Sequence, residues 1–103
     1  MKPIGAHNYF IYIITNIGKT VLYIGVTNDL GTRLIQHEIS AKTSKRTFAG
    51  RYNCFYLIYF ERFDVIEYAI EREKEVKGWS RKKKEALIAT TNPDWKFLND
   101  LIE

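Results

Sequence analysis

Five side chains have the types and the spacing that phosphodiester chemistry requires. Tyr12 and Tyr23 belong to two apolar runs and have ten residues between them. Arg33 precedes His37 by four residues, and Glu73 lies in a later stretch of helical periodicity. Metal-assisted cleavage of a phosphodiester needs an oxygen ligand for a hard cation, a positive clamp for the phosphate and a base for water. Together the five residues can supply all three.

Glu73 is in the least expected place of the five. A helix is predicted over residues 64–77, and its apolar face consists of Ile66, Ala69, Ile70 and Val76. Glu73 falls near the centre of that face. A carboxylate there is costly to bury unless it is paired, hydrogen-bonded or bound to a cation. A structural ion pair, for example with Arg33, and a functional cation site are equal alternatives at this point.

The other four residues also have structural alternatives. On a helix, Arg33 and His37 are neighbours on one edge of the apolar side, and a lone histidine is more often a satisfied partner than a catalyst. The two tyrosines, taken singly, can also be core residues with satisfied hydroxyls. A free phenol has a pKa of about 10, so only about one in a thousand is ionised at pH 7. A nearby arginine and a divalent ion would lower that pKa and favour a phenolate base.

Three strands are predicted from runs rich in isoleucine, valine, tyrosine and phenylalanine. They cover residues 9–15, 20–26 and 54–61. Asn16 and Gly18 suit a tight hairpin between the first two. Both of these runs are nearly continuously apolar, so we expect both faces of the sheet to be covered.

Helices are predicted around the strands, separated by a polar loop after residue 40. The first begins at a cap among Thr27, Asn28 and Asp29 and runs to about residue 40. Asp64 and Glu67 form a variant capping box for the helix that Gly78 ends. Ser80 caps a helix to about Ala89, and Pro93 opens a short final helix. The fold class is α/β (α+β): one domain over residues 1–103, with a small three-stranded antiparallel sheet flanked by helices.

Basic residues are concentrated in two clusters, although the net charge is only +4. The first lies in the predicted loop and comprises Lys42, Lys45, Arg46 and Arg51. The second opens the Ser80-capped helix and comprises Arg81, Lys82, Lys83 and Lys84. Two such clusters suggest a polyanionic partner bound through phosphate contacts. A merely solvated surface is an equal alternative for either cluster alone.

Composition excludes several classes of protein. No apolar run approaches the roughly 20 residues that span a bilayer, and the first residues do not resemble a signal peptide. The single cysteine, Cys54, cannot form an internal disulfide and argues against a structural zinc site. We therefore expect a cytoplasmic protein that does not bind membranes.

The motifs resemble those of the GIY-YIG nuclease superfamily, specifically its small stand-alone, single-domain bacterial members. The second motif is intact as Tyr23-Ile24-Gly25, and the first is present as Phe10-Ile11-Tyr12. The positions of Arg33, His37 and Glu73 also fit the family. The tail KGWSRKKKEALIATTNPDW is similar to the C-terminal half of the small members, so the resemblance covers almost the whole chain.

The resemblance implies a role for each residue. Glu73 would hold a single divalent ion, Mg²⁺ or Mn²⁺, and Arg33 would clamp the scissile phosphate. Tyr23 would be the general base, with Tyr12 beside it as hydrogen-bond partner or alternative base. His37 would orient water or relay a proton.

The expected function is metal-dependent endonucleolytic hydrolysis of nucleic acid, with DNA preferred to RNA. Because no separate recognition module is present, we expect structure-selective or weakly sequence-specific cleavage, in repair or recombination. The two basic clusters would contact the nucleic acid. The alternatives are a non-catalytic nucleic-acid-binding module of the same fold and a domain that needs a partner protein. The sequence leaves the oligomeric state open.

Overall fold

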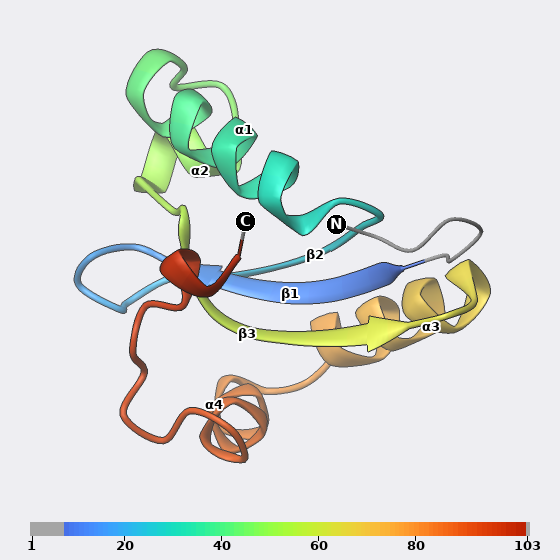
Figure 1. Cartoon of the computed structure of the whole chain (residues 1–103). Coiled ribbons are helices and arrows are strands. Elements are labelled where there is room, and N and C mark those ends of the chain that lie inside the picture. The colour runs from blue at the N-terminus through green and yellow to red at the C-terminus, as the bar shows by residue number, and fades with distance from the viewer. Residues whose placement is uncertain (1–7, 103) are drawn as a thin grey trace.

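The computed structural model describes residues 8–102, which form a three-stranded antiparallel sheet with helices on both faces (Figure 1). The strands are β1 (Tyr9–Thr15), β2 (Leu22–Thr27) and β3 (Tyr56–Phe63). Their order is β2-β1-β3, so the first strand is central. The predicted α+β fold is confirmed, and each later strand begins two residues after its expected start.

Both faces of the sheet are covered, as the apolar character of the first strand predicts. Ile11 and Ile13 belong to a core shared with the third and fourth helices. Tyr12 and Ile14, which point to the opposite face, belong to a second core beneath the first helix. All four side chains are fully buried. A central strand buried on both faces cannot alternate apolar with polar residues.

The β1–β2 turn is organised by Asn16. Its side-chain oxygen accepts the backbone N–H groups of Thr20 and Val21, at 2.9 and 3.1 Å. Lys19 takes the left-handed conformation, with φ of 58°. Asn16 therefore has a turn-forming role as expected, whereas the positive φ falls at Lys19 and not at Gly18.

Two helices cover one face of the sheet. Helix α1 (Leu30–Thr43) begins at Asp29, whose side chain accepts the N–H of Thr32. Helix α2 (Phe48–Tyr52) lies where the sequence predicted a polar loop. It packs so closely on α1 that a Cβ added at Gly50 would overlap the carbonyl of Ser44. Five residues are too few to show helical periodicity, so tertiary packing is what stabilises this turn.

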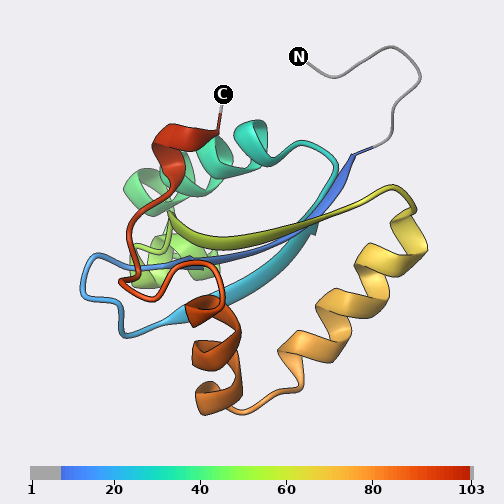
Figure 2. The ribbon, with the colours of Figure 1, turned by 60° about the horizontal axis from the view of Figure 1, so that its bottom comes forward.

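The other face carries α3 (Ile66–Lys77) and α4 (Arg81–Ala89) (Figures 1 and 2). Ser80 caps α4 as predicted. The predicted capping box of α3 is absent, because its first turn has no side-chain cap and Asp64 instead pairs with Arg62 at 2.6 Å. Ile66, expected in the core, is 42% exposed. Within residues 8–102, no helix is long and apolar enough to cross a membrane.

The C-terminal segment is largely not helical, which corrects the prediction of a final helix at Pro93. It runs back along the free edge of β3, and only a 3₁₀ turn, η1 (Asn99–Leu101), forms (Figure 2). Asn92 donates to the carbonyl of Ile58, and the side chain of Asn99 accepts the N–H of Leu57. These amide side chains satisfy backbone groups that an edge strand would otherwise leave exposed.

Candidate active site

Tyr12 is the buried centre of the candidate site. Its side chain is fully inaccessible to solvent. The hydroxyl oxygen accepts the Nε–H of Arg33 at 3.2 Å and lies 2.8 Å from Nε2 of His37. On the neighbouring strand, Tyr12 is paired with Gly25, where a Cβ would lie only 2.5 Å from the phenol Cζ. The glycine of the second motif therefore provides the space that the tyrosine of the first motif fills.

Both Tyr12 and His37 are neutral at physiological pH. Burial raises the pKa of Tyr12 to about 12, although Arg33 acts in the opposite direction. Arg33 therefore acts to lower the pKa of this tyrosine, as expected, but the opposing effect of burial is larger. Burial and the positive charge of Arg33 lower the pKa of His37 to about 4. With Arg33 donating to the phenol oxygen, a neutral His37 protonated on Nδ1 can accept the Tyr12 hydroxyl proton at Nε2.

Tyr23 is the more accessible of the two tyrosines. It is half-buried, and its ring centroid lies 5.3 Å from that of His37 and 5.2 Å from that of Phe48. It lines a small pocket of about 130 Å³ together with Arg33, Gln36, His37, Ser40, Thr47, Phe48 and Ala49. A small molecule such as water can reach this pocket, whereas the Tyr12 phenol is sealed behind it.

Arg33 carries a positive charge that no neighbouring carboxylate neutralises. Arg33 donates to the phenol of Tyr12 and to the side-chain oxygen of Gln36, the latter at 3.0 Å, and both of these groups are neutral. Among the residues that the structure describes, Arg33 forms no salt bridge. Partial burial acts to lower its pKa, but the hydrogen bond to Tyr12 and the nearby phenols raise it overall. Arg33 therefore presents a permanent charge to the pocket.

Glu73 does not form the structural pair with Arg33 that the sequence left open. Instead it pairs with Lys77, one turn later on α3, at 3.3 Å. The Glu73 side chain is only 15% exposed, whereas that of Lys77 is 51% exposed. Helix α3 packs against β1 and β2, and the charge of Glu73 contributes to raising the pKa of Tyr12. Glu73 does not line the pocket that contains Arg33.

A single carboxylate is compatible with one divalent ion of the magnesium type. In the described part of the chain, no group of three or more histidine, cysteine or acidic side chains is arranged to hold a metal. Mg²⁺ keeps several waters and often uses one or two protein carboxylates, so a site for it would not need such a group. The exposed ammonium of Lys77 can swing away from Glu73, because such a pair is weak.

The first basic cluster lies beside the pocket. Lys45, Arg46 and Arg51 line an open groove of about 480 Å³ together with Thr47, Phe48 and Tyr52. Thr47 and Phe48 also line the smaller pocket, so the two cavities share a wall. Lys42 lies on α1 and is paired with Glu38 at 2.8 Å.

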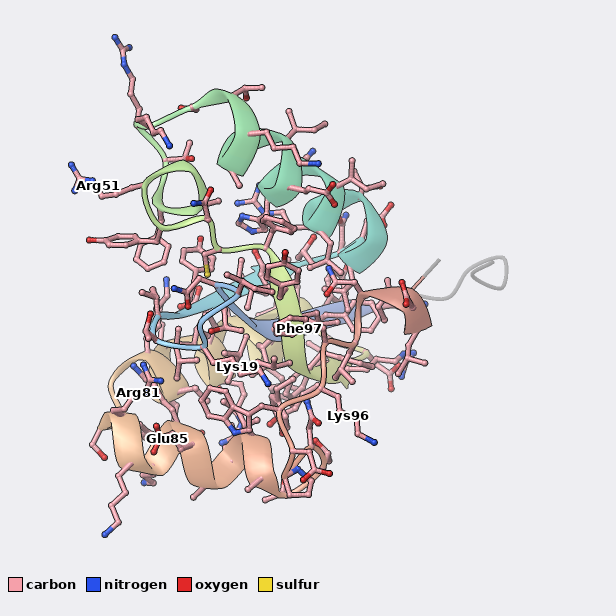
Figure 3. All side chains as sticks on the ribbon, turned by 90° about the vertical axis from the view of Figure 1, so that its left-hand side faces the viewer. Lys19, Arg51, Arg81, Glu85, Lys96 and Phe97 are labelled. Atoms are coloured by element: carbon pink, nitrogen blue, oxygen red, sulfur yellow. The ribbon has the colours of Figure 1, made fainter. Side chains whose placement is uncertain are left out.

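The second basic cluster lies on the opposite side of the sheet. Figure 3 places Arg81 and Glu85 on α4, remote from Arg51. Arg81 pairs with Glu85 and donates to the backbone carbonyl of Thr20, and Lys83 stacks on Trp79 at 4.3 Å. Lys82 and Lys84 lie on the same helix. The structure therefore does not unite the two clusters into one surface.

Sequence reasoning missed three contributors to the site. In the sequence Gly25 is visible only as part of the second motif, yet its missing Cβ admits the Tyr12 ring. Gln36 follows Arg33 by three residues, which is the spacing of helical neighbours and was the available clue. For Phe48, the only sign in the sequence of a place in the site was that it is an aromatic residue in a polar stretch.

The arrangement is that of a nuclease-type domain. It has two tyrosines on adjacent strands, an arginine and a histidine on the next helix, and a glutamate on a later helix. A family model described as the GIY-YIG catalytic domain matches residues 8–86, and the chain belongs to the GIY-YIG family.

Within this family the chain is similar to UPF0213 proteins. One from Bacillus pumilus is 39% identical over 82 residues, covering 80% of each chain. Another, from Natronomonas pharaonis, is 36% identical over 84 residues, covering 82% of this chain and 94% of the relative. The solution structure of a UPF0213 protein from Bacillus halodurans is 32% identical, with a TM-score of 0.55 over 91% of this chain and 96% of that one.

Proposed function

We propose that this protein is an endonuclease that hydrolyses phosphodiester bonds of nucleic acid with the help of a divalent ion. The observation that carries the proposal is the un-neutralised charge of Arg33, held by neutral partners at the wall of a small pocket. A partly buried arginine with a purely structural role would be expected to pair with a carboxylate. An arginine held ready by neutral groups is suited to binding an anion such as a phosphate.

Tyr23 is the general base in this proposal. It lines the pocket beside Arg33, where a water molecule and a phosphate can meet. Tyr23 takes a proton from water, the water oxygen attacks phosphorus, and the bond to the 3′-oxygen breaks as that oxygen takes up a proton from solvent. Tyr12 is not the base, because it is inaccessible and neutral. It orients Arg33, and His37 orients Tyr12.

Glu73 would hold the divalent ion, Mg²⁺ or Mn²⁺, once Lys77 had moved away from it. Such an ion supplies positive charge for the leaving oxygen and for a non-bridging phosphate oxygen. The low exposure of Glu73 strengthens its electrostatic interactions. Because Glu73 has a single carboxylate, water and phosphate would supply the other ligands of the ion.

DNA is the proposed substrate in preference to RNA, cut with structural selectivity or weak sequence specificity in cytoplasmic repair or recombination. The basic groove beside the pocket supports a nucleic-acid substrate, since its cations suit phosphate contacts rather than base readout. A partner protein that delivers the substrate is compatible with these contacts.

A non-catalytic nucleic-acid-binding module is the second candidate. The pairing of Glu73 with Lys77 favours it, because an ammonium then occupies the place of a metal ion. In that case binding would depend on the groove and be indifferent to Glu73.

The two candidates are separated by incubating the protein with labelled single-stranded, duplex and branched DNA and with RNA. Each is tested with EDTA, Mg²⁺ or Mn²⁺, beside Glu73→Gln, which keeps the size of the side chain and removes its charge. The nuclease proposal expects divalent-dependent cutting that the variant loses while binding persists. Binding without cutting on every substrate would instead establish the second candidate.

A further inference from the structure

The groove beside the small pocket combines three cations with two aromatic rings. Lys45, Arg46 and Arg51 surround the rings of Phe48 and Tyr52. None of the three cations forms a salt bridge with an acid in the part of the chain that the structure describes. In the α4 cluster Arg81 is paired with Glu85, while Lys82, Lys83 and Lys84 form no salt bridge with the described acids. The groove differs from that cluster in its place beside the small pocket, with which it shares Thr47 and Phe48.

The aromatic rings form a continuous series that leads out of the small pocket. The ring centroid of Tyr23 lies 5.2 Å from that of Phe48, which lies 4.7 Å from that of Tyr52. Phe48 is 38% exposed and Tyr52 is 42% exposed. Large aromatic faces of this kind are favourable surfaces for stacking a nucleic-acid base.

We infer that the groove is a binding site for one unpaired nucleotide adjacent to the bond that is cleaved. Its phosphate contacts Arg51, Lys45 or Arg46, and its base stacks on the exposed faces of Phe48 and Tyr52. The inference rests on the proposed function, because the adjacent bond is placed in the pocket of Tyr23 and Arg33. The shared wall of Thr47 and Phe48 puts the two cavities in contact.

The base in this groove must be unpaired. Inside a duplex both faces of a base are covered by its neighbours, so a side chain can stack on it only where the base is splayed out or single-stranded. The proposed substrate class is therefore a nucleic acid with an unstacked nucleotide at the cut, such as a single strand, a flap or a bulge.

The test measures binding, so that it does not depend on catalysis. A fluorescein-labelled single strand, the same strand with abasic residues in place of its bases, and the matching duplex are titrated with the protein in EDTA, and Kd is measured by anisotropy. We expect the single strand to bind roughly ten-fold more tightly than the abasic strand, which is the scale of one stacked base. Tyr52→Leu should remove most of that difference.

Two further variants control for charge and for general loss of an aromatic residue. Arg51→Gln should weaken binding of the normal and abasic strands equally and reduce the salt dependence of both. Tyr68→Leu removes an aromatic ring that is 61% exposed on α3 and should change neither Kd. Phe48 is left intact, because its contact with Tyr23 would mix stacking with damage to the pocket.

Equal affinity for the normal and abasic strands would overturn the inference, as would a base preference that Tyr52→Leu leaves unchanged. The outcome for the proposed function is separate. Base-dependent binding without cleavage would support the nucleotide site and contradict the nuclease proposal. Cleavage without base-dependent binding would support the nuclease proposal and contradict the nucleotide site.

Discussion

The phenol of Tyr12 lies directly over Gly25, its partner on the neighbouring strand, at a position where a Cβ would overlap the hydroxyl. The tyrosine of one motif and the glycine of the other are thus two halves of one contact. Through its hydroxyl, Tyr12 then holds Arg33 and His37. A change at residue 25 is transmitted to the candidate site through a single side chain.

Gly25→Ala should therefore reduce both stability and cleavage. The methyl group forces the Tyr12 ring to move inside a packed core, which typically costs about 1–3 kcal/mol. Chemical denaturation measures the stability, and the cleavage assay measures the site. Gly18→Ala is the matched control, because the nearest atom to its Cβ would be 3.9 Å away. Equal effects of the two variants would contradict the packing argument.

Tyr12→Phe and Tyr23→Phe should differ in what they damage. Removing the Tyr12 hydroxyl deprives Arg33 and His37 of a buried partner, so we expect a loss of about 1–3 kcal/mol in the free energy of unfolding as well as weaker cleavage. Tyr23→Phe should abolish cleavage with little change in stability. A Tyr23→Phe protein that cuts at the normal rate would remove Tyr23 from the role of base.

The pKa of His37 predicts acid sensitivity. In the unfolded chain the imidazole has its ordinary pKa of about 6.5, whereas in the folded protein burial and Arg33 lower the pKa to about 4. As pH falls through this window, the unfolded state binds the proton first, so stability decreases. The decrease is on the order of 1–3 kcal/mol and is measured by denaturation between pH 7 and 4.5.

His37→Gln is the control for this pH dependence. Glutamine can still accept the hydroxyl proton of Tyr12 but does not titrate. The unfolding free energy of the His37→Gln variant should vary less between pH 7 and 4.5 than that of the unsubstituted protein. Identical pH profiles would show that other groups cause the acid sensitivity.

The comparison of sequence with structure shows which features local patterns determine. Strands β1 and β2 were predictable because a continuous run of β-branched and aromatic residues has few other stable conformations. Ser80 was predictable as a cap, and Asp29 as one of three candidate caps, because the hydrogen bond is local in sequence. The final helix was mispredicted because Asn92 and Asn99 bond to β3, far away along the chain.

The same distinction applies to the candidate site. The five residues could be selected from their types and spacings, but their partners could not. Glu73 pairs with Lys77 rather than Arg33, and Tyr12 is buried while Tyr23 is accessible. The partner of Glu73 and the burial of each tyrosine depend on alternation along the strands and on the packing of distant elements. The spacing of the motifs does not determine either of these.

Lys77→Met should improve metal binding if Glu73 is the ligand. The Lys77 ammonium lies 3.3 Å from the Glu73 carboxylate and competes with a cation for it. We expect Mn²⁺ to bind several-fold more tightly to the variant in calorimetry, and cleavage to need less Mg²⁺. Glu73→Gln should bind neither ion detectably. Unchanged affinity in Lys77→Met would indicate that the ion does not use Glu73.

Arg81→Ala and Arg51→Ala should separate the structural from the nucleic-acid-binding basic residues. Arg81 donates to the carbonyls of Lys19 and Thr20, so it anchors the β1–β2 turn to α4 (Figure 3). Its loss should lower the free energy of unfolding by about 1 kcal/mol and leave nucleic-acid affinity nearly unchanged. Arg51 is exposed in the groove, so its loss should leave stability unchanged.

For Arg51→Ala we expect the slope of log K against log salt to become smaller by about one phosphate contact. Binding titrations over a range of salt concentrations measure this slope, and thermal unfolding measures the stability of both variants. If Arg81→Ala instead lost affinity at normal stability, the face of α4 would have to be part of the nucleic-acid surface. The substrate would then have to reach around the edge of the sheet, since the helix lies on the face opposite the groove (Figure 1).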